Sequence, residues 1–130
     1  HECGRPPLFS LIAQTAAYTF GERYLDEMLL YLEKNIDLAT EYLSDLPVSF
    51  HRPEASFLLW VDCRKLQLNT AELTSLLAEA GISADPGHYY DTYKIASYTG
   101  LQHHFRLAIG MPRSLLEPAL DKLRQRLLRY

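Results

Sequence analysis

The residue with the clearest chemical potential is Arg106, which lies inside the largely apolar segment HHFRLAIGMPR, residues 103–113. Side chains alternate between two faces of an extended segment, so Phe105 and Leu107 share one face and Arg106 lies on the other. A guanidinium offers a planar fork of donors that matches a carboxylate, and it keeps its charge at any relevant pH. Spacing alone leaves two interpretations open, a carboxylate-binding group or a solvent-facing arginine on a half-exposed strand.

A second candidate surface is the loop DPGHYYDTYKIASYTG, residues 85–100, which carries four tyrosines. Long loops often form lids or binding surfaces, and the alternative is a surface loop held by its own ring contacts. His88 is of a residue type that titrates near neutral pH. No Ser, Cys or carboxylate stands at a spacing that would build a nucleophile and its base around it.

Apolar spacing predicts the elements that position these residues. A first helix is expected over residues 8–18, closed by Gly21, and a second from Glu22 to Pro47. The second helix far exceeds the average of about 11 residues, which suggests that it runs between this domain and another. After it we expect a strand before a turn at 52–54 and a strand over 56–62. A helix follows, capped at Asn69 or Thr70 and ended by Gly81. The chain then continues with a short strand from Ile82, the strand around Arg106 and a last helix capped by Ser114.

This order of elements predicts an α+β fold, with a small antiparallel or mixed sheet and helices packed on one of its faces. The other face is then available to water or to a partner domain. We expect residues 1–45 to form an N-terminal helical segment with a long interdomain-type helix, and residues 46–130 to form the small domain.

Composition narrows the functional class. The chain has 130 residues, 48% hydrophobic and 22% charged, which is typical of a soluble globular domain with one core. A net charge of -3 argues against a nucleic-acid or anionic-membrane partner, and no apolar run approaches the roughly 20 residues of a membrane span. Cys3 and Cys63 lack zinc spacing and are interpreted as reduced thiols of a cytoplasmic protein. His103 and His104 should diverge on a strand, so no metal site is predicted.

Four blocks carry a resemblance to a known family: AAYTFGERYLDEMLLYLEKN, PEASFLLWVDCRKL, ISADPGHYY and HHFRLAIGMPR. In the same order and with similar gaps, they resemble the C-terminal part of class I/II aminotransferases, which are fold-type I pyridoxal-phosphate enzymes. The likeness is greatest to the MalY/PatB-type cystathionine β-lyases, or C–S lyases. It implies an aspartate-aminotransferase-like small domain in which Arg106 binds the α-carboxylate of an amino-acid substrate. The neighbouring loop adds His88, Tyr89 and Tyr90 as further substrate-binding candidates.

The same resemblance implies what the chain lacks. The cofactor lysine of the family lies in a large-domain segment upstream of these blocks, and none of the lysines here has its serine-rich context: Lys34, Lys65, Lys94 and Lys122. We therefore expect pyridoxal phosphate in a full-length enzyme, with no cofactor-binding or catalytic residue in this chain. The chain begins at His1, and it is expected to be a fragment that lacks the large domain, is inactive alone and comes from a homodimer.

Some positions depart from the family pattern. Ala108 stands where the family has an asparagine, Met111 replaces a Thr or Cys, and the aromatic-glycine step after Tyr90 is absent. These changes leave the choice between lyase and transaminase open. A non-catalytic interaction or regulatory domain that keeps this fold remains the alternative function.

Overall fold

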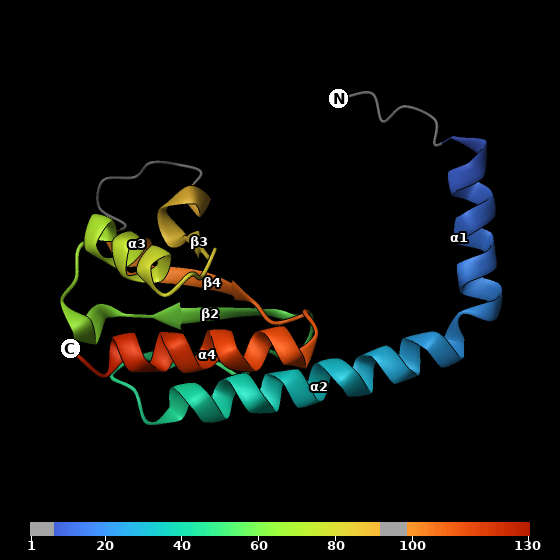
Figure 1. Cartoon of the computed structure of the whole chain (residues 1–130). Coiled ribbons are helices and arrows are strands. Elements are labelled where there is room, and N and C mark those ends of the chain that lie inside the picture. Colours follow the sequence, from blue (N-terminus) through green and yellow to red (C-terminus); the bar gives the residue numbers. More distant parts are fainter. Residues whose placement is uncertain (1–6, 92–98) are drawn as a thin grey trace. The chain divides into compact units, whose positions relative to one another are not determined.

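The structure, a computed structural model, describes residues 7–91 and 99–130, and the chain divides into two compact units, residues 1–33 and 34–130. The first unit holds α1 (Leu8–Phe20) and the start of α2 (Glu22–Ser44) (Figure 1). Gly21 joins the two helices, and a side chain there would meet the Ala17 carbonyl oxygen at 2.4 Å. None of the α1 residues is buried.

The division between the units falls inside α2, whereas the sequence predicts a boundary after residue 45. The second half of this helix buries Ile36, Ala39 and Leu43 in the core of the second unit. Buried apolar side chains decide which unit a helix segment belongs to, so the long helix contributes its last three turns to the small domain.

The second unit is built on an antiparallel sheet with the strand order β1-β2-β4-β3. Its strands are β1 (Ser49–Phe50), β2 (Leu58–Asp62), β3 (Asp85–Pro86) and β4 (His104–Ala108). The predicted strands are present but shorter. For example, β2 begins two residues late because Ser56 has a positive φ of 74°, which is incompatible with an extended strand.

One face of the sheet is buried beneath helices, which confirms the α+β prediction. Leu59, Val61 and Phe105 are fully buried there, and they share one core with apolar residues of α2, α3 (Thr70–Glu79) and α4 (Arg113–Leu127). The core also contains Cys63, and burial raises the pKa of its thiol to about 12. Across the described residues, no helix combines the length and apolarity that crossing a bilayer would need.

The helix starts test two sequence predictions. Asn69 caps α3 as expected, because its side chain accepts from the backbone of Ala71 and Glu72 while the Glu72 carboxylate accepts from the Asn69 backbone. The predicted Ser114 cap of α4 is wrong. That helix already begins at Arg113, and its cap position is taken by Pro112, which has no side-chain donor or acceptor.

Candidate functional site

Arg106 lies at the centre of β4, and the strand register fixes its neighbours. It faces Trp60 across the β2–β4 pair and Asp85 across the β3–β4 pair. Directly paired residues project from the same side of a sheet. These three side chains therefore meet on the face opposite the buried core.

Contacts turn this arrangement into a cluster. Arg106 Nη2 donates a hydrogen bond to Asp85 Oδ2, and the Tyr90 hydroxyl donates to the same oxygen at 2.9 Å. The Arg106 guanidinium carbon lies 4.7 Å from the centre of the Tyr90 ring, a cation–π distance. Trp60 meets the Tyr90 ring edge-on, with centroids 5.3 Å apart. We call Trp60, Asp85, Tyr90 and Arg106 the Arg106 cluster.

Gly87 allows Tyr90 to reach this position. Residues Gly87–Tyr90 form a short 3-10 turn directly after β3. A side chain at Gly87 would meet the Leu101 carbonyl oxygen at 2.2 Å and the His104 carbonyl oxygen at 3.0 Å. The turn therefore packs closely against the chain that enters β4 only because this residue has no Cβ.

The protonation states within the cluster follow from its contacts. Hydrogen bonds from Tyr90 and then from Arg106 hold the pKa of Asp85 below its ordinary value. Burial, and then the hydrogen bond to Asp85, raises the pKa of Tyr90. At neutral pH the cluster thus contains a carboxylate, a neutral phenol donor and a guanidinium. The Arg106 side chain remains 28% exposed, so a ligand has access to it.

A second ionic group lies on the same sheet face. Asp62 accepts from Arg64 Nη2 at 2.5 Å and lies 3.8 Å from Nε2 of His104, its register partner on β4. The hydrogen bond from the Arg64 side chain is the largest cause of a lowered Asp62 pKa. Arg64 and Arg106 therefore each have a carboxylate beside them.

Asn35 fixes the end of the strand that carries Arg106. This buried amide on α2 donates to the carbonyl oxygens of Ile109 and Met111 at 2.8 and 2.9 Å. Its Oδ1 accepts from Arg113 Nε at 3.0 Å. The connection between β4 and α4 is therefore anchored to the second half of α2, which holds β4 in place.

Of the three loop residues that the sequence suggests for substrate binding, one contacts Arg106 and two do not. Tyr90 joins Arg106, while His88 and Tyr89 contact each other with ring centroids 4.6 Å apart. Tyr89 is 71% exposed, and within the described residues the contacts of Arg106 are with Asp85 and Tyr90. The remainder of the tyrosine-rich loop, residues 92–98, lies outside the described residues.

Sequence reasoning missed Asp85 and also missed Trp60, which pairs with Arg106 from the opposite side. A signal existed, because Trp60 has the same alternation on β2 that Arg106 has on β4. Only the register makes the two residues opposite each other, and neither strand's sequence specifies that register. Asn35 was missed as well, since one asparagine on a long helix looks like a surface residue.

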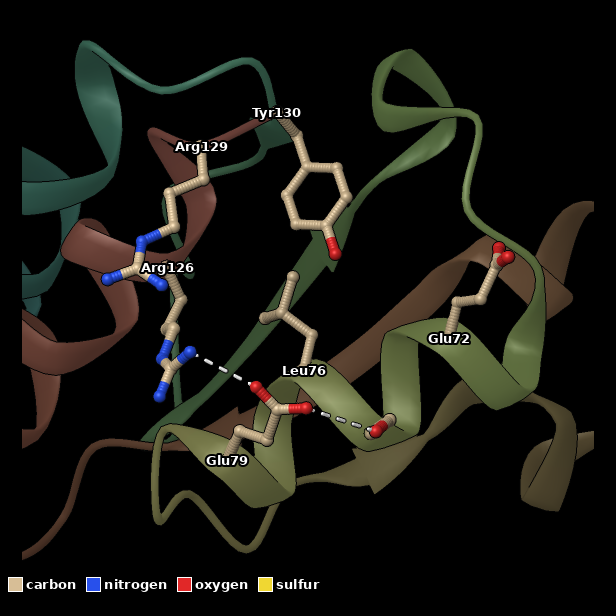
Figure 2. Close-up of a pocket in the computed structure, with 7 residues that line it drawn as sticks. Glu72, Leu76, Glu79, Arg126, Arg129 and Tyr130 are labelled. Atoms are coloured by element: carbon tan, nitrogen blue, oxygen red, sulfur yellow. Dashed lines mark hydrogen bonds and ion pairs between the residues drawn. The ribbon is translucent and has the colours of Figure 1, made fainter.

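A groove of about 430 Å³ lies elsewhere in this unit, between α3 and the end of α4. Figure 2 shows Glu72 and Glu79 on one side and Arg126 and Arg129 on the other, with Arg126 paired to Glu79 at 3.1 Å. Two carboxylates balance two guanidinium groups there. The groove shares no residue with the Arg106 cluster and has no excess charge with which to select an ionic ligand.

Comparisons with known proteins identify the family and the fold of the chain. Residues 8–123 match the family described as aminotransferase class I and II. Cystathionine beta-lyase PatB of Bacillus subtilis is 33% identical over 119 residues, which are 89% of this chain and 29% of that protein. The crystal structure of a pyridoxal-phosphate-bound putative aminotransferase from Clostridium difficile 630 matches 95% of this chain and 31% of its own, with a TM-score of 0.82 and 33% identity.

A pyridoxal-phosphate-bound C–S lyase from Staphylococcus hominis also shares the fold, with a TM-score of 0.78 and 26% identity over 98% of this chain and 30% of its own. The chain spans about 30% of the length of these relatives. The family match covers most of the sequence, from α1 into α4. The chain belongs to the aminotransferase class I and II family.

Proposed function

We propose that this chain is the substrate-binding small domain of a pyridoxal-phosphate-dependent enzyme acting on amino acids, and that Arg106 binds the substrate α-carboxylate. The observation that carries the proposal is a partly exposed guanidinium held on the open face of the sheet by Asp85 and Tyr90. A planar guanidinium binds a carboxylate through two parallel hydrogen bonds, which fixes orientation as well as position.

The chain's own residues would orient the substrate rather than transform it. Arg106 projects from a strand anchored by Asn35, and its guanidinium is held by the contacts with Asp85 and Tyr90. The Tyr90 ring lies against the guanidinium and limits the directions from which a carboxylate can approach. A carboxylate held in one orientation presents the rest of the amino acid to the reactive groups in one geometry, which lowers the entropic part of the barrier.

The described residues do not fit pyridoxal phosphate itself. Enzymes of this kind hold the cofactor through a lysine amine, and the Arg106 cluster contains no lysine. Of the described lysines, Lys34 lies on α2, Lys65 follows β2 and Lys122 lies on α4. When bound, the cofactor supplies an electron sink for carbanion chemistry. We propose that the remainder of a longer protein holds it, in a large domain that also forms a homodimer in the cytoplasm.

Of the two reactions, we favour cleavage of a carbon–sulfur bond in a cystathionine-like thioether. The curated relatives include several cystathionine beta-lyases, from Bacillus subtilis and Corynebacterium glutamicum among others. Amino-group transfer is the alternative, supported by the putative aminotransferase from Clostridium difficile. Product analysis separates them, because β-elimination yields a thiol, pyruvate and ammonia without an added 2-oxo acid, whereas transamination requires one.

The test is the kinetics of Arg106→Ala in the whole gene product loaded with pyridoxal phosphate. Hydrogen bonds to charged groups contribute about 1.5–3 kcal/mol, so kcat/KM should fall roughly 10- to 150-fold. Arg124→Ala is the matched control, because it removes a partly exposed arginine that pairs with Asp45 on the same unit. Unchanged kcat/KM in Arg106→Ala would exclude the proposed role. A gene product of only 14.9 kDa would favour a non-catalytic interaction or regulatory domain instead.

A further inference from the structure

The guanidinium of Arg106 is only partly used by the protein. Its hydrogen bond to Asp85 comes from Nη2, and it is the single hydrogen bond that this guanidinium makes within the described part of the chain. An arginine side chain has five N–H donors. The pair with Asp85 therefore leaves N–H donors of Arg106 available for the α-carboxylate of a ligand. Asp85 and that α-carboxylate would then share one guanidinium.

The charges on this face of the sheet determine how favourably the carboxylates of a ligand would bind there. The positive charge of Arg106 is already offset by Asp85, and Arg64 and His104 both lie beside Asp62. A bound α-carboxylate gains direct hydrogen bonds from Arg106. A further carboxylate on the same ligand would find no described cation on this face that lacks an acidic neighbour, and it would be repelled by Asp85.

We propose that Asp85 is a specificity-determining residue, which orients Arg106 for the substrate α-carboxylate and disfavours amino acids that carry a second carboxylate. This inference rests on the proposed function of Arg106. Asp85 acts by two routes. Its Oδ2 accepts from both Arg106 and the Tyr90 hydroxyl, which fixes the guanidinium, and its charge selects against dicarboxylates.

The experiment measures dissociation constants by calorimetry for L-alanine and L-aspartate on the whole protein carrying pyridoxal phosphate. We compare wild type with Asp85→Asn, which keeps an oxygen acceptor for Arg106 and Tyr90 but removes the charge. Interactions between partly exposed charges change affinity by about two- to five-fold. The ratio of the aspartate constant to the alanine constant should therefore fall about two- to five-fold in Asp85→Asn.

Matched variants separate charge from shape. Asp85→Glu retains the negative charge, so its ratio should stay near that of wild type. Asp45→Asn removes a more exposed carboxylate of the same unit, one that pairs with Arg124 at 3.1 Å, and it should leave the ratio unchanged. Thermal unfolding of each variant checks that the fold is intact.

The Arg106→Ala variant distinguishes a failure of the proposed role of Arg106 from a failure of the inference about Asp85. If it leaves both dissociation constants unchanged, the proposed function of Arg106 is wrong, and the inference about Asp85 fails with it. If it weakens both amino acids while Asp85→Asn leaves their ratio at the wild-type value, Arg106 binds the carboxylate and Asp85 does not select. An equal fall of the ratio in Asp45→Asn would also overturn the inference, because the effect would then come from net charge alone.

Discussion

The two faces of the β2–β4 pair are built from alternate residues of the same strands, yet they differ in almost every property. On one face Leu59, Val61 and Phe105 have no exposed surface. On the other, Trp60 is 37% exposed and the Arg106 side chain 28%. The first face supplies apolar burial, and the second supplies charges, ring contacts and hydrogen-bond donors.

This difference teaches how a charged site is held on so short a strand. Arg106 contributes little to stability itself, because its ion pair with Asp85 is half exposed and such pairs are weak. Its position is fixed from behind by Phe105 and Leu107, the flanking residues that enter the core. Stability and chemistry are therefore divided between the two faces, and substitutions should separate them.

The largest expected effect is on the buried face. Phe105→Ala should lower the free energy of unfolding by about 3–5 kcal/mol, because it removes apolar contacts and leaves a cavity. Arg106→Ala, one residue along the same strand, should cost no more than about 1 kcal/mol. Urea unfolding followed by circular dichroism measures both. Similar losses for the two variants would contradict the division between faces.

A smaller loss of stability is expected from substitution of Asn35, which bonds the backbone just after β4. Asn35→Ala leaves the Ile109 and Met111 carbonyl groups without their amide donor, and unsatisfied buried polar groups cost about 1–3 kcal/mol. Thr40→Ala on the same helix is the control, since the Thr40 hydroxyl donates to the Ile36 and Asp37 carbonyl groups of its own helix. A loss no larger than that of the control would show that Asn35 does not anchor β4.

Asn35→Ala should also affect binding more than its stability cost suggests. A loosened β4 end would misplace Arg106 without removing it, so we expect KM for the amino-acid substrate to rise in the whole protein. Asn35→Asp tests the same point differently, because it keeps an acceptor for Arg113 Nε while losing both donated hydrogen bonds. Unchanged KM in both variants would limit Asn35 to a purely structural role.

Much of the fold was predictable because its signals are local. Alternation assigned Phe105 and Leu107 to the face opposite Arg106, and both are buried in the structure. The Asn69 cap was readable for the same reason, since its partner Glu72 lies three residues away. Both predictions depend on spacing within one element, which a sequence displays directly.

What could not be predicted depends on pairing between distant segments. The Asp85–Arg106 contact joins residues 21 positions apart through the β3–β4 register. The amide of Asn35 reaches Ile109 across 74 positions. The Ser114 cap failed for a local reason instead, because Ser114 followed by Glu117 matches a capping box while Pro112 already starts the helix at Arg113. The role proposed for Arg106 came from resemblance to a family, and alternation indicated only which face of the strand the residue occupies.

The smallest expected effect is the response of the charged face to acid. Asp62 and Asp85 both have pKa values below the ordinary 3.8. A depressed folded pKa stabilises the fold above the unfolded value, and this contribution is lost as the pH falls through the folded pKa. Stability should therefore decline below about pH 4, where protonation of these carboxylates weakens their pairs with Arg64 and Arg106.

The two carboxylates should not contribute equally to this decline. The Asp62 side chain is 16% exposed and accepts several hydrogen bonds from Arg64, whereas that of Asp85 is 48% exposed. Solvent screens the charge of the more exposed carboxylate more strongly, so Asp62→Asn should flatten the acid limb more than Asp85→Asn. Thermal unfolding from about pH 6 to pH 2 measures the slopes. If Asp85→Asn has the larger effect, the Arg106 cluster stabilises the sheet more than its exposure implies, and the separation between the two faces is weaker than inferred.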